Sequence, residues 1–396
     1  DDVGRAVPSG EFQQGQPLSE LSTLADLGVK WIRTDAWYED FNGTDYILDA
    51  EHVATAAYCV AHDINMNVIL QIGSINVNTF ATFALAATEA FAATGATIAI
   101  EFGNEPHNNG LLIALGGLWY GAAPATWLIR YVEMVNEAVA RIKAFDPTIK
   151  VMCEDDVWVI SYWMLEVGLT TDLTTMAFHP YPGSGDRPEP VAVAWDQDWC
   201  QPFQVCNFNG SFISAIKRLR ARALLKLGKN VDLFANEIGW TQAGRESLVA
   251  NNIARSFVLG SAAGVDVMCW FSAYDGPDGS WGLKDNALSP RLSYQAFKTM
   301  TLQLNAYERA TRVAGIADQI NGIQAFILNG ASNRKLVVWT GNSSSIVKNS
   351  PDLTATIVDR DGAAVTNNAT LTYTGSPLYF TTTATDATLA AWAATL

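Results

Sequence analysis

The sequence predicts an α/β protein, a (β/α)8 barrel (TIM barrel) followed by a C-terminal antiparallel β-sandwich. Between Val29 and Phe271, short runs rich in Val, Ile, Leu, Met and Phe alternate about eight times with longer helical stretches, and the composition changes after Asn305. Strand–helix alternation repeated eight times is typical of a closed parallel barrel. The chain has 396 residues, enough for one barrel of roughly 250–300 residues and a smaller partner.

The expected barrel strands are nearly continuous apolar runs, as in strands that are buried on both faces of a parallel sheet. They cover residues 29–35, 66–73, 97–105, 149–155, 175–181, 231–239 and 265–271, with a poorly marked first strand near 2–6. Helical patterns lie between them, and the one over 211–228 stops at Gly228, a usual helix-ending residue. A doubly wound open sheet is the alternative, but the sequence has no glycine-rich phosphate loop after its first strand.

The segment from Tyr307 to Leu396 is rich in Thr, Ser, Asn and Gly, and turn signals such as Asp361-Gly362 separate its short strands. These strands cover residues 324–329, 335–340, 354–359, 370–374 and 378–383. We therefore expect two domains, a barrel over residues 1–306 and a β-sandwich over residues 307–396, with no long linker between them.

The composition excludes several classes of partner. The net charge is 25 − 40 = −15, which repels nucleic acid and anionic membranes and leaves a neutral substrate as the better match. Hydrophobic residues make up 49% of the chain and charged residues 16%, so a large core can be buried. The sequence contains no apolar run long enough to span a bilayer. It opens at Asp1 with neither Met nor a signal-like segment, and we expect a mature secreted or periplasmic protein that is a monomer.

The five cysteines fall into two groups. Cys59, Cys153 and Cys269 lie in apolar runs and are expected to be small core residues. Cys200 and Cys206 lie in a loop-like, aromatic-rich stretch, and we predict a local disulfide between them, which would suit an oxidising compartment. Metal binding is the alternative, but none of the four histidines has a spacing that completes a site with this pair. We therefore expect no metal and no cofactor.

Two glutamates mark the expected active site, because reactive groups of such barrels gather at the C-terminal ends of the strands. Glu105 ends the run IEFGNEP, Glu237 ends LFANEIGW, and each follows an asparagine. Hydrolysis of a glycosidic bond needs one carboxylic acid and one carboxylate on opposite sides of the anomeric carbon. An ordinary carboxylate paired with Arg or Lys explains one such glutamate well, but it explains two with the same context less well.

The Asn-Glu-Pro after the fourth expected strand and the glutamate of the seventh resemble the signature of clan A glycoside hydrolases. The resemblance covers about Val29 to Asn305 and implies that Glu105 is the acid/base and Glu237 the nucleophile. Four kinds of position also match the clan: the strand-two arginine, the asparagine that contacts the sugar 2-hydroxyl, the strand-six His-x-Tyr and the strand-eight tryptophan under the reacting sugar. They are Arg33, Asn104, His179 with Tyr181, and Trp270.

Within the clan, family 39 is the nearest, because GVKWIRTD, GNEP, AFHPY and a C-terminal β domain have parallels there. Family 5 is the second choice. It shares NEPH and His-x-Tyr, but its strand-three histidine is missing, since VILQIG ends in Gln71-Ile72-Gly73.

The roles of these groups lead to expectations about their charges. Glu105 should have a raised pKa, because it must carry a proton near a second carboxylate. Glu237 should stay ionised through contacts with Arg33 and Tyr181. For His179 the alternative is a structural role, in which its ring nitrogens support the end of the sixth strand.

Aromatic residues in the expected strand-end loops suit a sugar, whose C–H faces stack on rings. From these we select Trp119, Trp240 and Trp281 as substrate-binding candidates, although loop packing explains many such residues. The sequence thus predicts a retaining β-glycosidase that cuts a neutral β-linked polysaccharide, of glucan or xylan type, within the chain. The alternatives are an exo-acting enzyme such as a β-xylosidase, a transglycosylase, and a catalytically silent carbohydrate-binding barrel.

Overall fold

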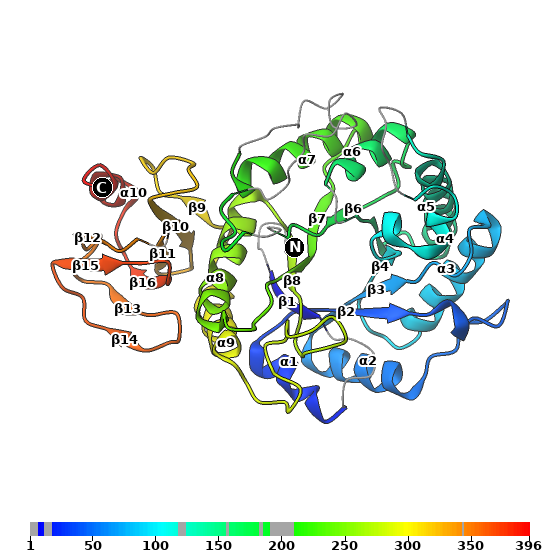
Figure 1. Cartoon of the computed structure of the whole chain (residues 1–396), viewed down its shortest axis with the longest axis horizontal. Helices are drawn as coiled ribbons and strands as arrows, with labels where there is room; N and C mark the ends of the chain where they lie inside the picture. The colour runs from blue at the N-terminus through cyan, green and yellow to red at the C-terminus, as the bar shows by residue number, and fades with distance from the viewer. Residues whose placement is uncertain are drawn as a thin grey trace.

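A computed structural model describes residues 7–11, 18–117, 124–155, 158–181, 185–190, 210–342 and 344–396, with side chains from residue 18 onward. Eight parallel strands close a barrel in sequence order (Figure 1). They are β1 (Val7–Glu11), β2 (Trp31–Ala36), β3 (Asn65–Leu70), β4 (Ile98–Phe102), β5 (Lys150–Cys153), β6 (Thr175–Phe178), β7 (Asp232–Ile238) and β8 (Val267–Trp270). The predicted barrel is therefore confirmed.

The first strand is where the prediction was wrong. β1 covers Val7–Glu11, not residues 2–6, and it pairs with both β2 and β8, for example Gly10 with Ile32 and Val7 with Val267. Its sequence VPSGE contains proline and glycine, which weaken a strand pattern. Its place is determined by the two neighbouring strands that it joins, and this information lies far away in the sequence.

Helices follow the strands and surround the barrel (Figure 1). The main ones are α1 (Ser22–Leu27), α2 (Ala50–His62), α3 (Val77–Ala92), α5 (Thr126–Phe145), α6 (Trp158–Val167), α7 (Phe212–Leu227), α8 (Glu246–Ala263) and α9 (Leu292–Leu304). Local capping determines several ends: Asp49, Asn76 and Ser211 accept backbone N–H groups at helix starts. Gly228 ends α7 with φ 70°, as the sequence predicted. Among the described residues, no helix is both long enough and apolar enough to cross a membrane.

Strand side chains alternate between the barrel interior and the layer beneath the helices. One small cluster fills the interior: Trp31, Ala99, Met152, Ala177, Phe234, Val267 and Cys269. Their strand neighbours, such as Ile32, Ile100 and Met268, belong to the large cluster between the strands and the helices. This alternation decides which strand-end side chains can reach the mouth of the barrel.

The C-terminal part forms two antiparallel sheets beside α8 and α9 (Figure 1). The larger has the order β14-β13-β16-β11-β10-β9 and the smaller pairs β12 with β15. Their bounds are β9 (Thr311–Arg312), β10 (Ile323–Asn329), β11 (Arg334–Thr340), β12 (Ile346–Asn349), β13 (Thr356–Val358), β14 (Ala364–Val365), β15 (Thr370–Tyr373) and β16 (Leu378–Thr382). A helix that the sequence analysis did not predict, α10 (Asp386–Ala393), packs on this core through Leu389 and Trp392.

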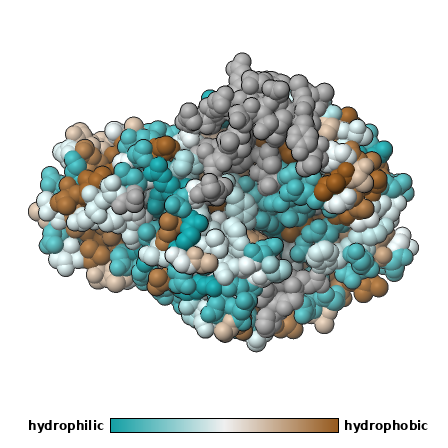
Figure 2. Space-filling view, in the orientation of Figure 1, coloured by the Kyte–Doolittle hydropathy of each residue, from teal (hydrophilic) through white to brown (hydrophobic). Residues whose placement is uncertain are grey.

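The C-terminal sheet is tied to the barrel by apolar contacts and by hydrogen bonds. Trp339 of β11 belongs to the large barrel cluster, and its Nε1 donates to Glu189 at 2.7 Å. Glu189 also forms a buried ion pair with Arg255 of α8. On the face in Figure 2, hydrophilic and neutral residues cover much of the described centre of the barrel, and apolar residues gather on the C-terminal part and at the far edge of the barrel.

Candidate active site

A pocket of about 640 Å³ lies at the C-terminal ends of the barrel strands. Its lining is a mixture of charged, amide and aromatic side chains from β2, β3, β4, β6, β7 and β8 and the segments that follow them. It includes Arg33, Asp35, Gln71, Asn104, Glu105, Tyr181, Glu237, Trp240, Arg245, Phe271, Asp278 and Trp281. The strand ends of a barrel thus bring together residues that are more than 200 positions apart in the chain.

Glu105 reaches the pocket through an unusual backbone conformation. It has φ 45° and ψ 65°, in the left-handed region that residues other than glycine rarely adopt. Such a conformation costs about 1–3 kcal/mol and persists only where surrounding contacts impose it. Here the backbone N–H of Glu105 donates to the Oε1 atom of Glu154, and Pro106 begins the short helix η3 (Pro106–Asn108) immediately afterwards.

Glu237 reaches the pocket because β7 changes its register. Phe234 lies in the barrel interior and Ala235 in the outer layer, so regular alternation would turn Glu237 outward. The pairing of β7 with β8 shifts between Ala235 and Ile238. This irregularity, of the kind that re-aims side chains next to active sites, leaves Ile238 in the outer layer and Glu237 in the pocket.

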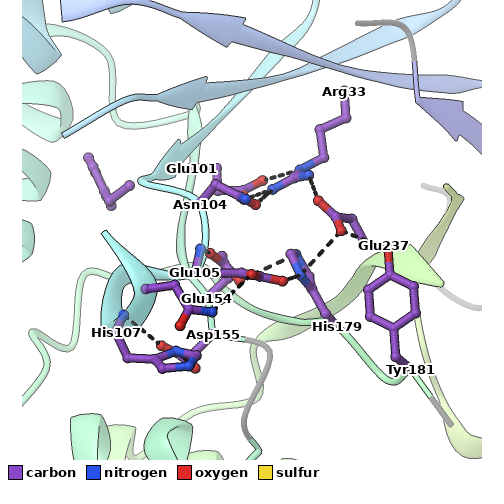
Figure 3. A network of polar contacts seen from close by, with 12 residues as sticks. Arg33, Glu101, Asn104, Glu105, His107, Glu154, Asp155, His179, Tyr181 and Glu237 are labelled. Carbon is purple, nitrogen blue, oxygen red and sulfur yellow. Dashed lines mark hydrogen bonds and ion pairs between the residues drawn. The ribbon is translucent and has the colours of Figure 1, made fainter. Parts of the chain in front are cut away.

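Arg33 is the charged centre of the site (Figure 3). Its side chain is buried, and its Nε and Nη2 atoms donate to the Glu101 carboxylate at 3.1 and 2.6 Å. Nη2 also donates to Asn104 Oδ1 at 2.6 Å, and Nη1 donates to Glu237 Oε1. Tyr181 donates its hydroxyl to Glu237 Oε2 at 2.8 Å. The expected contacts of Glu237 with Arg33 and Tyr181 are therefore present.

His179 lies between the glutamates (Figure 3). Its Nδ1 atom is 2.9 Å from Glu105 Oε1 and 3.5 Å from Glu237 Oε2. Its Nε2 atom is 3.3 Å from Glu154 Oε2, a close contact without hydrogen-bond alignment. The expected raised pKa of Glu105 is wrong: burial raises this pKa, but the hydrogen bond and the charge of His179 outweigh it, so the pKa is lowered.

The two glutamates raise the pKa of His179. Burial lowers this pKa, but the charge of Glu237 and the hydrogen bond to Glu105 more than compensate. Both shifts favour a proton on His179 and a negative charge on Glu105 in the free protein. One carboxylate oxygen of Glu105, one of Glu237 and a ring nitrogen of His179 all lie within 4.8 Å of one another.

The structure does not bring every predicted residue into the pocket. Trp270 is fully buried and packs in the outer layer against Trp240, with the rings tilted and their centroids 5.7 Å apart. Because Cys269 points into the barrel, alternation turns Trp270 outward and Phe271 inward, and Phe271 lines the pocket instead. Trp240 and Trp281 line the pocket. Trp119, Cys200 and Cys206 lie outside the described residues.

Sequence analysis missed several polar residues of the site. Glu101 accepts from Arg33 and, at 2.5 Å, from Asn67. Asp35 accepts from Gln71 at 2.6 Å, and burial raises the pKa of Asp35. A signal existed for Glu101 and Asn67, since each is a polar residue in the middle of an apolar strand run, where it needs a partner.

Among the described residues, two groups of side chains have spacing that could hold a metal ion: Glu101, Glu154 and His179, and Glu105, His179 and Glu237. The guanidinium of Arg33 is already bonded to Glu101 and to Glu237. Carboxylate oxygens that are neutralised by an arginine are poor ligands for a second cation, so the donor set fits a hydrogen-bonded network better than a metal centre.

Comparison with known proteins places the fold. No protein-family model and no curated protein matches the chain. Among solved structures, a family 39 glycoside hydrolase from Bacteroides cellulosilyticus WH2 superposes with TM-score 0.75 at 15% identity, over 96% of this chain and 81% of that chain. A family 30 subfamily 8 xylanase, Xyn30A, from Clostridium acetobutylicum gives TM-score 0.63 at 13% identity, over 96% and 97% of the two chains. A 4-O-α-L-rhamnosyl-β-D-glucuronidase from Fusarium oxysporum 12S gives 0.62 at 11%, over 96% of each chain. The likeness spans both parts of the chain, which has the fold of these glycoside hydrolases.

Proposed function

We propose that the protein is a retaining β-glycoside hydrolase of clan A, with Glu237 as nucleophile and Glu105 as acid/base. The observation that carries the proposal is the approach of the two carboxylates to within 4.8 Å in one strand-end pocket. Retaining enzymes hold their two carboxyl groups about 5–5.5 Å apart, whereas inverting enzymes need about 6.5–9.5 Å to admit a water molecule. The short separation supports direct attack of Glu237 on the anomeric carbon.

The hydrogen bonds support this division of roles. Glu237 accepts from Arg33 and Tyr181, and these two donors fix the orientation of the buried carboxylate for attack. Glu105 bonds to His179 Nδ1, a group that can give or take a proton along a 2.9 Å contact. Because the pKa of Glu105 is lowered in the free protein, we assign His179 as the source of the proton that Glu105 gives to the leaving oxygen.

The charge of Glu237 couples the protonation of His179 to the attack on the sugar. It is the main cause that raises the pKa of His179, and it disappears as Glu237 forms the covalent bond to the sugar. His179 then becomes a stronger acid, its Nδ1 proton moves to Glu105, and Glu105 protonates the leaving oxygen. In the second step Glu105 removes a proton from water, Glu237 regains its charge on release of the sugar, and the proton returns from Glu105 to His179. The proton count balances over one turnover.

The pocket supports a neutral sugar. Its carboxylate Asp278 disfavours an anionic substrate, and Arg245 is engaged by Asp186 at 2.5 Å. Phe271 and Trp281, whose ring centroids lie 5.8 Å apart, form an aromatic wall for C–H faces. We propose a β-linked glucan or xylan as substrate, cleaved within the chain. Release of monosaccharide alone from chain ends would instead identify an exo-acting enzyme.

A mechanism-based trap tests the assignment. A 2-fluoro β-glycoside should label the peptide that contains Glu237 with one sugar, and Glu237→Gln should take no label and lose nearly all activity. Glu105→Ala should accumulate the covalent sugar, and azide should restore its turnover. A label on another residue, or a first product with inverted configuration, would contradict the roles. Binding of sugar without turnover by the wild type would identify a silent carbohydrate-binding barrel.

A further inference from the structure

Glu154 is a buried carboxyl group whose side-chain contacts with the described residues lead to the acid/base. It follows β5, its side chain is fully buried, and its Oε1 atom accepts the backbone N–H of Glu105. Its Oε2 atom lies 3.3 Å from His179 Nε2. In the part of the chain that the structure describes, it forms no ion pair with a lysine or an arginine.

The groups that face Glu154 are mostly acidic. Glu101 and Glu105 approach from β4 and its end, Asp155 is its neighbour in sequence, Arg33 comes from β2, His179 from β6 and Tyr131 from α5. Arg33 is bonded to other carboxylates, those of Glu101 and Glu237. Burial, followed by the charges of Glu101 and Asp155, raises the pKa of Glu154 well above its ordinary value.

We propose that Glu154 is a positioning residue for the acid/base: a neutral carboxylic acid that holds the left-handed backbone of Glu105 and supports the ring of His179. This inference rests on the proposed function, because it assigns Glu105 as acid/base. Through the backbone N–H, Glu154 determines where the Glu105 carboxyl begins. Through its contact with Nε2 of His179, it supports the ring whose Nδ1 atom exchanges a proton with that carboxyl group. Glu154 does not line the pocket, so it acts on the reaction through these two partners.

Two substitutions separate its contacts from its charge. Glu154→Gln keeps an oxygen for the Glu105 N–H but cannot ionise, and Glu154→Leu removes both contacts. Glu189→Gln is the matched control, because Glu189 is an equally buried carboxylate at the seam with the C-terminal sheet, outside the pocket. Each variant is assayed with an aryl glycoside that has an activated leaving group and with an unactivated glycoside of the same sugar, with and without azide.

Positioned general acids contribute about 10²–10⁴-fold to rate. Because Glu154→Gln keeps the oxygen that accepts from Glu105, its kcat should stay within about threefold of the wild-type value on both substrates. Glu154→Leu should lose about 100-fold or more on the unactivated substrate and far less in the glycosylation step of the activated one, and azide should accelerate its turnover. Glu189→Gln should change stability and leave the ratio of the two substrates unaltered. Equal losses on both substrates without azide rescue would show a merely structural role and overturn the proposal.

A titration of His179 decides the charge of Glu154 without any assay of activity. The chain has four histidines, so the His179 ring signals in an NMR titration can be assigned with His179→Asn. If Glu154 is neutral, Glu154→Gln shifts the pKa of His179 by less than about half a unit. A fall of more than about one unit would show that Glu154 carries a charge and refute the proposal. If Glu154→Leu fails to fold, the titration of Glu154→Gln still decides the charge of Glu154. A wild type without glycosidase activity would refute the proposed function and leave this titration result unaffected.

Discussion

Replacing Arg33 with lysine keeps the positive charge at the centre of the site but removes its planar fork. Arg33 bonds Glu101 through Nε and Nη2 and Glu237 through Nη1, so its donors face two carboxylates in different directions. A single ammonium nitrogen cannot serve both. Hydrogen bonds to charged groups contribute about 1.5–3 kcal/mol, and a buried carboxylate left without its partner costs about 3–5 kcal/mol. We expect Arg33→Lys to lower the free energy of unfolding by about 2–3 kcal/mol.

The same loss should appear in the reaction, because Glu237 would no longer be held for attack. A loss of about 2–3 kcal/mol corresponds to a fall in kcat/KM of about 30–150-fold. Urea unfolding followed by tryptophan fluorescence and steady-state kinetics measure the two effects. Arg130→Lys is the matched control: that side chain is 43% exposed and pairs with Glu133 at 2.9 Å, so the change should stay within about 0.5 kcal/mol. If Arg33→Lys were as stable and as active as the wild type, the role of Arg33 as the shared partner of both carboxylates would be refuted.

Further substitutions test the aromatic wall, the packing and the pH dependence. Phe271→Ala should lower kcat/KM about tenfold or more, whereas Trp270→Phe should lower the urea midpoint and leave KM unchanged; the reverse pattern would restore Trp270 to the pocket. Gly73→Ala would place a Cβ atom 2.1 Å from a tyrosine ring and should lower the unfolding free energy by about 2 kcal/mol, unlike Gly110→Ala, where nothing lies within 4 Å. The raised pKa of Glu154 stabilises the fold below its unfolded pKa of about 4.3, and this contribution is lost as pH rises. The unfolding free energy of the wild type minus that of Glu154→Gln should therefore fall as the pH rises above about 4.3, and a rise would contradict the neutral state.

The barrel could be predicted from sequence because its strands and helices are encoded locally. Apolar runs predicted seven of the eight strands within a few residues, since a strand buried on both faces needs apolar side chains along its whole length. The opening strand, VPSGE, carries no such pattern. Its position depends on β2 and β8, whose edges it closes, and only the assembled barrel supplies that constraint.

The direction of individual side chains was harder to predict than the strands. Trp270 was assigned to the pocket from its place at the end of a strand, but Phe271, one residue later, lies there. A one-residue error in register reverses the face to which a side chain points. Glu237 shows the same effect with the opposite result, because the irregularity between Ala235 and Ile238 carries it into the pocket.

The sequence by itself determined which chemistry the chain can contain: a parallel barrel, two glutamates at strand ends, and the arginine, tyrosine and histidine expected beside them. Only the tertiary structure decided how these groups share charge and protons. Glu105 and His179 come from different parts of the chain, and the hydrogen bond and the charge of His179 lower the pKa of Glu105 where the sequence suggested that it would be raised. Electrostatic interactions depend on distance and burial in three dimensions, and neither can be read from the positions of these residues along the chain.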